Sequence, residues 1–265
     1  MLFGRKKPAE AANTRRILKL ATFPTAIYAV GDIHGSLRLY NEIERQIVED
    51  GAFVPGPKLI LCLGDVVDRG AETAGLLDRL MGPAPAGFQR MVLRGNHEDM
   101  MLEFIKTPER HMNWVEFGGE ETLASYGIRP DTPQGFRGES RTLKRKLDAG
   151  IPDTHISFLE NLPIALVVGK YRFAHAGYSL GKVEDQQSSE LLLWGPPEAA
   201  DSYQGDEILV HGHTIVEDVD VRPNRINLDI GAYKTGRLAA MRFTGTTMDR
   251  QIFIADGRSA ATNVV

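Results

Sequence analysis

The stretch AIYAVGDIHG, residues 26–35, decides the fold, because a short apolar run passes directly into polar residues set between glycines. The apolar run is typical of a buried strand, and Asp32 and His34 follow it. Taken alone, this ending indicates a polar turn that closes a core strand. The same kind of ending recurs in LILCLGDVVDRG (59–70) and RMVLRGNHED (90–99). Three such endings favour a shared functional site over a simple turn.

Strands and helices alternate along the first hundred residues. Amphipathic helical patterns at 37–49 and 74–81 separate the first three apolar runs, which predicts parallel βαβ units. Later runs lie closer together, and VVGKYRF (167–173) indicates a tight hairpin, so we expect a mixed sheet or two facing sheets. The predicted strands are 26–30, 59–63, 90–94, 164–168, 171–176, 207–212, 225–230, 237–243 and 250–255.

The remaining segments suggest how the chain is organised. Residues 99–163 contain helical patterns separated by Pro- and Gly-rich turns, and they are too short to form much of a core alone. We therefore expect a lid-like helical insertion within a single domain of residues 25–265. Residues 1–24 are expected to be a flexible basic tail, since the first 20 residues carry six basic side chains against one acidic side chain. A mitochondrial presequence is the alternative, and the apolar stretch of a secretory signal is missing.

Composition excludes several classes of function. With 42% hydrophobic and 25% charged residues, the 265-residue chain is typical of a soluble globular protein. Its net charge of −4 gives no basic field for nucleic acid. No window approaches about 18 uninterrupted apolar residues, so no membrane span is expected. The single cysteine, Cys62, lies in an apolar run and is expected to be a core thiol, which fits a reducing cytoplasm.

Polar side chains at the strand ends point to metal binding. Parallel strands place their carboxyl ends along one edge of a sheet, where α/β folds hold their sites. Carboxylates and imidazoles gathered there repel one another unless a cation neutralises them. Arg69 and Arg94 neutralise part of this charge but lie beside the cluster, whereas divalent ions can be coordinated at its centre. The residues expected to converge are Asp32, His34, Asp65, Asp68, Asn96 and His97.

The ligand types narrow the choice of metal. Carboxylate, imidazole and amide groups without a thiolate favour Mn²⁺, Fe or Zn²⁺ over a structural zinc site. Further histidines follow later strands, in FAHAG (His175) and ILVHGHT (His211 and His213). This set is large enough for two divalent ions that share one carboxylate at the ~3.5–4 Å spacing of two-metal hydrolytic sites.

The three motifs, in the forms Gly-Asp-x-His-Gly, Gly-Asp-x-x-Asp-Arg-Gly and Gly-Asn-His-Glu, resemble those of the calcineurin-like metallophosphoesterases. The Arg-Gly-Asn-His-Glu form is similar to the phosphoprotein phosphatase branch, particularly its small bacterial and phage members. The resemblance covers residues 27–235. It implies a central mixed β-sandwich flanked by helices, and a water held between two metal ions as the nucleophile.

The resemblance also implies a role for each matching residue. Asp32 and His34 would hold the first metal, and Asp65 would bridge both. His97 would protonate the leaving oxygen, oriented by Asp68. The second metal would be held by Asn96, His175 and His213, and the phosphate by Arg69 and Arg94.

The second histidine pair and the phosphate-binding arginines are the two features to compare with the family pattern. His213 followed by Thr fits the Gly-His-Thr form of this branch, so His211 is interpreted as a core or supporting histidine rather than a ligand. The branch usually has another phosphate-binding arginine between the last two histidine ligands, but no arginine lies between Arg172 and Arg222. This gap leaves the substrate class open.

Three functions compete. The leading hypothesis is a metal-dependent serine/threonine protein phosphatase, whose partner would be a phosphorylated protein or a phosphorylated small molecule. The alternative enzyme is a hydrolase of diadenosine polyphosphates, since that family shares the same three motifs. The third is a non-catalytic phosphate-binding regulator, but degenerate members normally lose a ligand or the acidic histidine. The sequence carries no signal for the oligomeric state.

Overall fold

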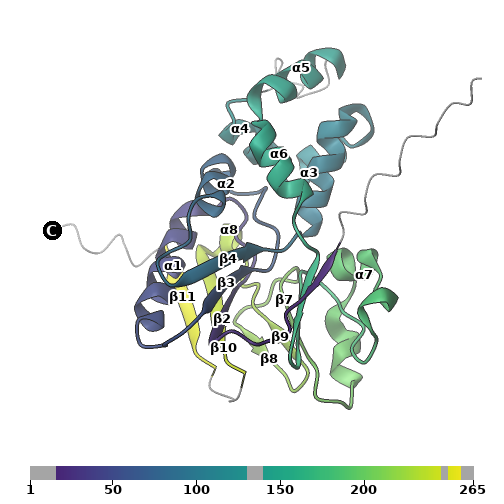
Figure 1. Cartoon of the computed structure of the whole chain (residues 1–265). Helices are drawn as coiled ribbons and strands as arrows, with labels where there is room; N and C mark the ends of the chain where they lie inside the picture. Colours follow the sequence, from purple (N-terminus) through teal and green to yellow (C-terminus); the bar gives the residue numbers. More distant parts are fainter. Residues whose placement is uncertain (1–15, 130–139, 246–249, 258–265) are drawn as a thin grey trace, which may run out of the picture.

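Two β-sheets face each other between layers of helices in the computed structural model, which describes residues 16–129, 140–245 and 250–257 (Figure 1). The predicted α/β architecture, a mixed β-sandwich flanked by helices, is confirmed. The strand order is β11-β10-β2-β3-β4 in one sheet and β1-β5-β6-β7-β9-β8 in the other. The strands are β1 (Ile17–Lys19), β2 (Ala26–Val30), β3 (Lys58–Cys62), β4 (Phe88–Val92), β5 (Ala165–Val168), β6 (Tyr171–Ala174), β7 (Ile208–His211), β8 (Asp220–Val221), β9 (Arg225–Asn227), β10 (Arg237–Phe243) and β11 (Ile252–Asp256).

The five-stranded sheet begins with the predicted parallel units. β2, β3 and β4 are parallel neighbours, whereas β10 pairs antiparallel with β2 and β11 pairs antiparallel with β10. Side chains alternate between the two faces of each strand. In β2, Ile27 and Ala29 pack against the other sheet, whereas Tyr28 and Val30 pack against helices. Cys62 of β3 is fully buried on the helical side, as the sequence predicted.

The six-stranded sheet contains the predicted hairpin and one unexpected strand. β5 and β6 pair antiparallel with Val168 opposite Tyr171, and β6, β7 and β9 run parallel. β1 pairs in parallel with β5, so the expectation of a flexible tail is wrong for Ile17–Lys19. Three residues are too few to show a clear apolar alternation, and Leu18 becomes ordered because it packs on the core between the sheets. Residues 1–15 lie outside the described part of the chain.

Helices cover the outer face of each sheet. α1 and α2 bury apolar stripes, including Ile43, Ile47 and Leu76, against the five-stranded sheet. α7 and a 3-10 turn place Leu192, Leu193 and Ala200 against the six-stranded sheet. The helices are α1 (Leu37–Gly51), α2 (Thr73–Met81), α3 (Asn96–Lys106), α4 (Glu120–Ser125), α5 (Ser140–Gly150), α6 (Asp153–Glu160), α7 (Ser189–Trp194) and α8 (Ala232–Thr235), with shorter turns η1 (Pro108–Arg110), η2 (Val115–Gly119), η3 (Glu184–Gln186) and η4 (Pro197–Ser202).

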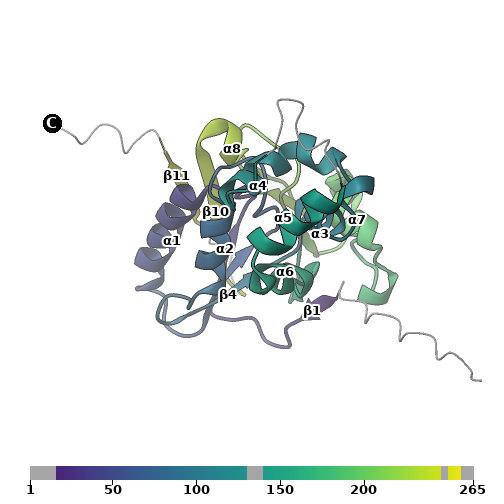
Figure 2. The same ribbon diagram turned by 90° about the horizontal axis from the view of Figure 1, so that it is seen from above.

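The predicted helical insertion contains α3 to α6, which gather beyond one end of the strands (Figures 1 and 2). Its buried residues Leu123, Leu147 and Leu159 belong to the same apolar cluster as the residues of α1 and α2. The insertion therefore shares the core of the sheet, and its function as a lid stays a prediction. In the part of the chain that the structure describes, no helix is long and apolar enough to cross a membrane.

Candidate active site

The carboxyl ends of six strands, three from each sheet, carry the candidate site. The strands are β2, β3 and β4 in one sheet and β6, β7 and β9 in the other. Because these strands run in parallel within each sheet, their polar end residues collect at one edge of the sandwich. The structure brings together the predicted residues Asp32, His34, Asp65, Asp68, Arg69, Asn96, His97, His175 and His213.

Asp65 lies at the centre of two potential metal-binding groups. One group is His34, Asp65 and His97, and the other is Asp65, His175 and His213. In each group the possible ligand atoms lie within 4.8 Å of one another. Asp65 Oδ2 is 3.6 Å from His34 Nε2 and 3.4 Å from His175 Nε2. This central position is the geometry that a carboxylate shared by two ions requires.

Asn96 and Asp32 both contact the group that contains His175 and His213. Asn96 Oδ1 is 2.8 Å from His175 Nε2 and 3.0 Å from His213 Nδ1. Asp32 Oδ2 accepts the backbone N–H of His213, whereas the buried Oδ1 has no hydrogen-bond partner among the described residues. A buried carboxylate oxygen without a donor is costly unless a cation occupies its free side.

The charges of the cluster fit a cationic occupant. Burial raises the pKa of Asp32 well above its usual range, and the carboxylates of Asp229 and Asp65 add to the shift. Burial also opposes ionisation of Asp65, but nearby His175, His97 and His34 outweigh it and lower its pKa. Divalent ions would relieve this repulsion between buried acids. The donor set therefore fits metal binding.

His34 and His175, one from each group, have the neutral imidazole that binds metals. Burial lowers the pKa of His34 to about 3 and that of His175 to about 4, so both rings are neutral at pH 7. His34 Nδ1 is held by the carbonyl of Val67 at 2.8 Å, and His175 Nδ1 by the carbonyl of Leu63 at 3.2 Å. These bonds place the proton on Nδ1, so each Nε2, which faces Asp65, carries no proton.

His97 and Asp68 form an acid pair beside the metal groups. His97 Nδ1 is 2.7 Å from Asp68 Oδ2, and His97 Nε2 is 3.9 Å from Asp65 Oδ2. Burial disfavours the charged imidazole, but the carboxylates of Asp65 and Asp68 outweigh it and raise the pKa of His97. The indole N–H of Trp114 and the hydroxyl of Thr122 donate to Asp68 and fix its orientation. His97 can therefore carry a proton towards the cluster near neutral pH.

Strained backbone concentrates in this region. In the described residues, every non-glycine residue with positive φ belongs to the cluster: His34 (45°), Asp65 (47°), Asp68 (70°), Arg69 (68°) and His213 (66°). Such conformations cost about 1–3 kcal/mol each and persist where the surrounding structure enforces them. Their coincidence with the candidate ligands supports a functional site.

Glu98 is a site residue that the sequence analysis quoted but gave no role. Its buried carboxylate accepts the backbone N–H groups of Gly95 and Asp65 at Oε2, and those of Val66 and Val67 at Oε1. The contacts tie the second motif to the third. Glu98 follows directly after the Gly-Asn-His sequence, and this position was the available signal. Asp229 was also missed, although it follows β9 in the same way that the other acids follow their strands.

The two arginines that the resemblance assigned to phosphate lie in different places. Arg69 Nη1 is 2.9 Å from His34 Nε2, within the cluster. Arg94 instead donates to the carbonyls of Leu159 and Glu160 at the end of α6. None of its hydrogen bonds among the described residues reaches the cluster. Phosphate holding by Arg94 therefore has no support from its contacts, because its Nη2 donates to the chain at the end of α6.

Aromatic side chains occupy the border of the cluster. The ring of Tyr233 lies over the Arg69 guanidinium, 4.7 Å from Cζ to the ring centroid, and the ring of Trp194 meets His213 edge-on at 6.3 Å. Trp194 lies within the segment between Arg172 and Arg222 that lacks an arginine. His211 is fully buried, with Nδ1 2.8 Å from the carbonyl of Gly212, and it lies outside both metal-binding groups. It is therefore a core histidine, as expected.

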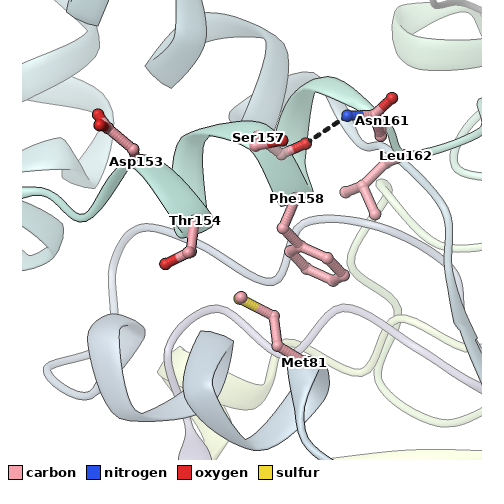
Figure 3. Close-up of a pocket in the computed structure, with 7 residues that line it drawn as sticks. All are labelled: Met81, Asp153, Thr154, Ser157, Phe158, Asn161 and Leu162. Carbon is pink, nitrogen blue, oxygen red and sulfur yellow. Dashed lines mark hydrogen bonds between the residues drawn. The ribbon is translucent and has the colours of Figure 1, made fainter.

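A separate groove lies between α2 and α6 (Figure 3). Figure 3 shows the sulfur of Met81 and the ring of Phe158 facing each other across it. Its lining includes none of the cluster residues, so it is distinct from the candidate active site.

Comparison with known proteins identifies the family. The family model described as calcineurin-like phosphoesterase matches residues 25–231. Serine/threonine-protein phosphatase 2 of Escherichia coli is 29% identical over 80% of this chain and 90% of its own. The asymmetrical bis(5'-nucleosyl)-tetraphosphatase PrpE of Anoxybacillus flavithermus is 24% identical over 81% of this chain and 89% of its own. A crystal structure described as a candidate diadenosine tetraphosphatase shares the fold, with a TM-score of 0.59, 19% identity and coverage of 92% of this chain and 99% of its own. The chain therefore belongs to the calcineurin-like phosphoesterase family of hydrolases.

Proposed function

We propose that this protein is a metal-dependent phosphomonoesterase that removes phosphate from phosphoserine or phosphothreonine in proteins. The observation that carries the proposal is the acid pair of His97 and Asp68, joined at 2.7 Å, beside the carboxylate of Asp65 that both metal-binding groups share. The relative from E. coli, named as a serine/threonine-protein phosphatase, supports this substrate class. The buried thiol of Cys62 supports a cytoplasmic location.

The family implies divalent metal ions, and the donor set fits two of them. Manganese is the proposed metal, with iron or zinc as alternatives, because the donors are oxygen and imidazole nitrogen without thiolate. When bound, such ions supply Lewis acidity to the phosphoryl group and to an attacking water. The residues that would hold them are Asp32 and His34 on one side, Asp65 in the centre, and Asn96, His175 and His213 on the other.

The protein's own side chains supply the remaining steps. His97 would donate the proton on Nε2 to the leaving oxygen, since its Nδ1 is held by Asp68. Asp68 keeps its orientation through the donors Trp114 and Thr122. The guanidinium of Arg69 can bind two phosphoryl oxygens at once. Both groups adjoin His34: Arg69 Nη1 is 2.9 Å from His34 Nε2, and the ring centroids of His97 and His34 are 4.9 Å apart.

A second candidate function is hydrolysis of a dinucleoside polyphosphate. Trp194 and Tyr233 expose 46% and 40% of their surface beside His213 and Arg69, and such rings can stack on nucleobases. The relatives named as bis(5'-nucleosyl)-tetraphosphatases support this alternative.

A substrate panel separates these functions. Manganese-loaded protein would be assayed with phosphoserine and phosphothreonine peptides, diadenosine tetraphosphate and p-nitrophenyl phosphate, and its metal content measured in the same preparation. We expect the highest kcat/KM with the phosphopeptides. Faster turnover of diadenosine tetraphosphate would favour the second function. Full metal content without turnover of any of these substrates would instead identify a non-catalytic phosphate-binding protein.

The role of His97 can be tested directly. His97→Asn should lower turnover by about 10²–10⁴-fold and keep the metal content, because it removes the proton donor but none of the proposed ligands. His111→Asn, at the one histidine between α3 and α4, is a matched control expected to keep full activity. Unchanged turnover of the His97 variant would remove this residue from the acid role.

A further inference from the structure

This inference rests on the proposed function and concerns how the protein binds phosphate with a reduced set of arginines. Among the described residues in contact with the cluster, Arg69 supplies the only guanidinium. Arg94 is engaged at the end of α6, and no arginine lies between Arg172 and Arg222. Phosphate binding therefore depends strongly on the orientation of one side chain.

The main chain of Arg69 is fixed by its surroundings. Its backbone has φ of 68°, and its N–H donates to the carbonyl of Gly118 at 2.9 Å. A Cβ atom at Gly118 would lie 2.6 Å from Arg69 Cγ, so this glycine allows the side chain to pass. These contacts fix where the side chain starts, but four rotatable bonds separate the backbone from the guanidinium.

Tyr233 fixes the other end of that side chain. Its ring lies over the guanidinium, with Arg69 Cζ 4.7 Å from the ring centroid, and the rings of Tyr233 and His34 make a T-shaped contact with centroids 5.3 Å apart and planes at 81°. α8 carries Tyr233 between two glycines in the left-handed conformation, Gly231 and Gly236. This short helix is anchored by Ala232, which is 2% exposed, whereas Tyr233 is 40% exposed. The ring thus faces the site and contributes little to the core.

We propose that Tyr233 is a positioning residue for phosphate binding, which holds the Arg69 guanidinium by stacking on its face. A stacked guanidinium directs its N–H groups outward along its edge, where they can bind two phosphoryl oxygens. The stack restricts the flexible side chain before the ligand arrives, which lowers the ordering cost of binding. The hydroxyl of Tyr233 has no part in this arrangement.

The test compares Tyr233→Leu with Tyr233→Phe, each alone and combined with Arg69→Gln. The dissociation constant of inorganic phosphate would be measured by calorimetry on manganese-loaded protein, together with KM and kcat for p-nitrophenyl phosphate. Tyr233→Leu should weaken phosphate binding about 3–5-fold, as the loss of a half-exposed cation–π contact implies, and raise KM by a similar factor with little change in kcat. Tyr233→Phe should retain wild-type binding.

The double variants separate positioning from other roles. In the Arg69→Gln background, Tyr233→Leu should have no further effect, because the group that the ring positions is missing. Phe53→Leu, an exposed aromatic change in the loop between α1 and β3, is the matched control and should change nothing. Thermal unfolding of every variant would check that the fold is kept.

Several results would overturn the inference. They are wild-type phosphate affinity in Tyr233→Leu, equal weakening by Tyr233→Phe, or the same weakening with and without Arg69. The proposed function fails separately, if the wild-type protein binds phosphate but turns over none of the phosphoesters. The phosphate measurement still tests Tyr233 in that case.

Discussion

Replacing Glu98 by Gln is the sharpest test of how the site is held together. The carboxylate accepts four backbone N–H groups, from Gly95, Asp65, Val66 and Val67, at distances of 2.6 to 3.1 Å. Burial and the charge of Asp65 raise the pKa of Glu98 to about 7, while the backbone N–H groups oppose this shift. Since both oxygens accept hydrogen bonds, the observed arrangement requires the ionised form.

The size of the effect follows from counting acceptors. Gln keeps one carbonyl oxygen but places an NH₂ group against the other two N–H donors. Two buried donors then lack an acceptor, at about 1–3 kcal/mol each, so we expect a loss of about 4 kcal/mol of unfolding free energy. For a domain of this size that corresponds to roughly 8–16 °C in the melting temperature. The strained backbone at Asp65, with φ of 47°, should relax as well, which weakens metal binding.

Thermal unfolding and metal analysis, each on manganese-loaded protein, would measure both effects of Glu98→Gln. Glu103→Gln is the matched control, because Glu103 lies on the same helix α3 and pairs with Lys106 at the surface. It should change the melting temperature by less than about 1 °C, since exposed ion pairs contribute little. An unchanged melting temperature together with full metal content in Glu98→Gln would refute the role of Glu98 in holding these backbone N–H groups.

Two further substitutions test the supports of the site. Gly212→Ala should remove about one of the two proposed metal ions, because a Cβ there would lie 1.9 Å from Asp32 Oδ1. Metal analysis against a Gly82→Ala control would show this loss. If this variant retained both ions, Asp32 would not be a metal ligand that depends on the close approach of Gly212. Trp114→Phe should reduce turnover about tenfold without loss of metal, since it removes the N–H donor to Asp68, and steady-state kinetics would measure it. Wild-type turnover would show that this donor is not needed.

Local sequence was sufficient for the strands that carry the site. The apolar runs before Asp32, Asp65 and Asn96 became β2, β3 and β4, because each run is too short for a helix and is bounded by glycine. The order of strands and helices also predicted that these three strands are parallel, which places their ends at one edge. β1 escaped prediction, because three residues of an edge strand leave no periodic pattern.

The contacts of individual side chains could not be deduced in the same way. Arg94 lies directly before the third motif and Arg69 is the penultimate residue of the second, yet only Arg69 contacts the cluster. The difference arises because the chain that returns from α6 brings its carbonyls to Arg94. Tyr233 and Trp114 reach the site from helical segments more than 45 residues away from the side chains that they contact. Such long-range partners have no fixed spacing in the sequence.

The sequence by itself determined which residue types stand at the strand ends, and with them the donor chemistry of the proposed metal site. Those residues are local, since each motif lies within a few positions of the strand that carries it. Only the tertiary structure decided how the motifs meet: Asp65 at the centre, Glu98 across four backbone donors, and Tyr233 over Arg69. The physical reason is that ligand and donor types are properties of single residues, whereas orientation depends on the packing of distant segments.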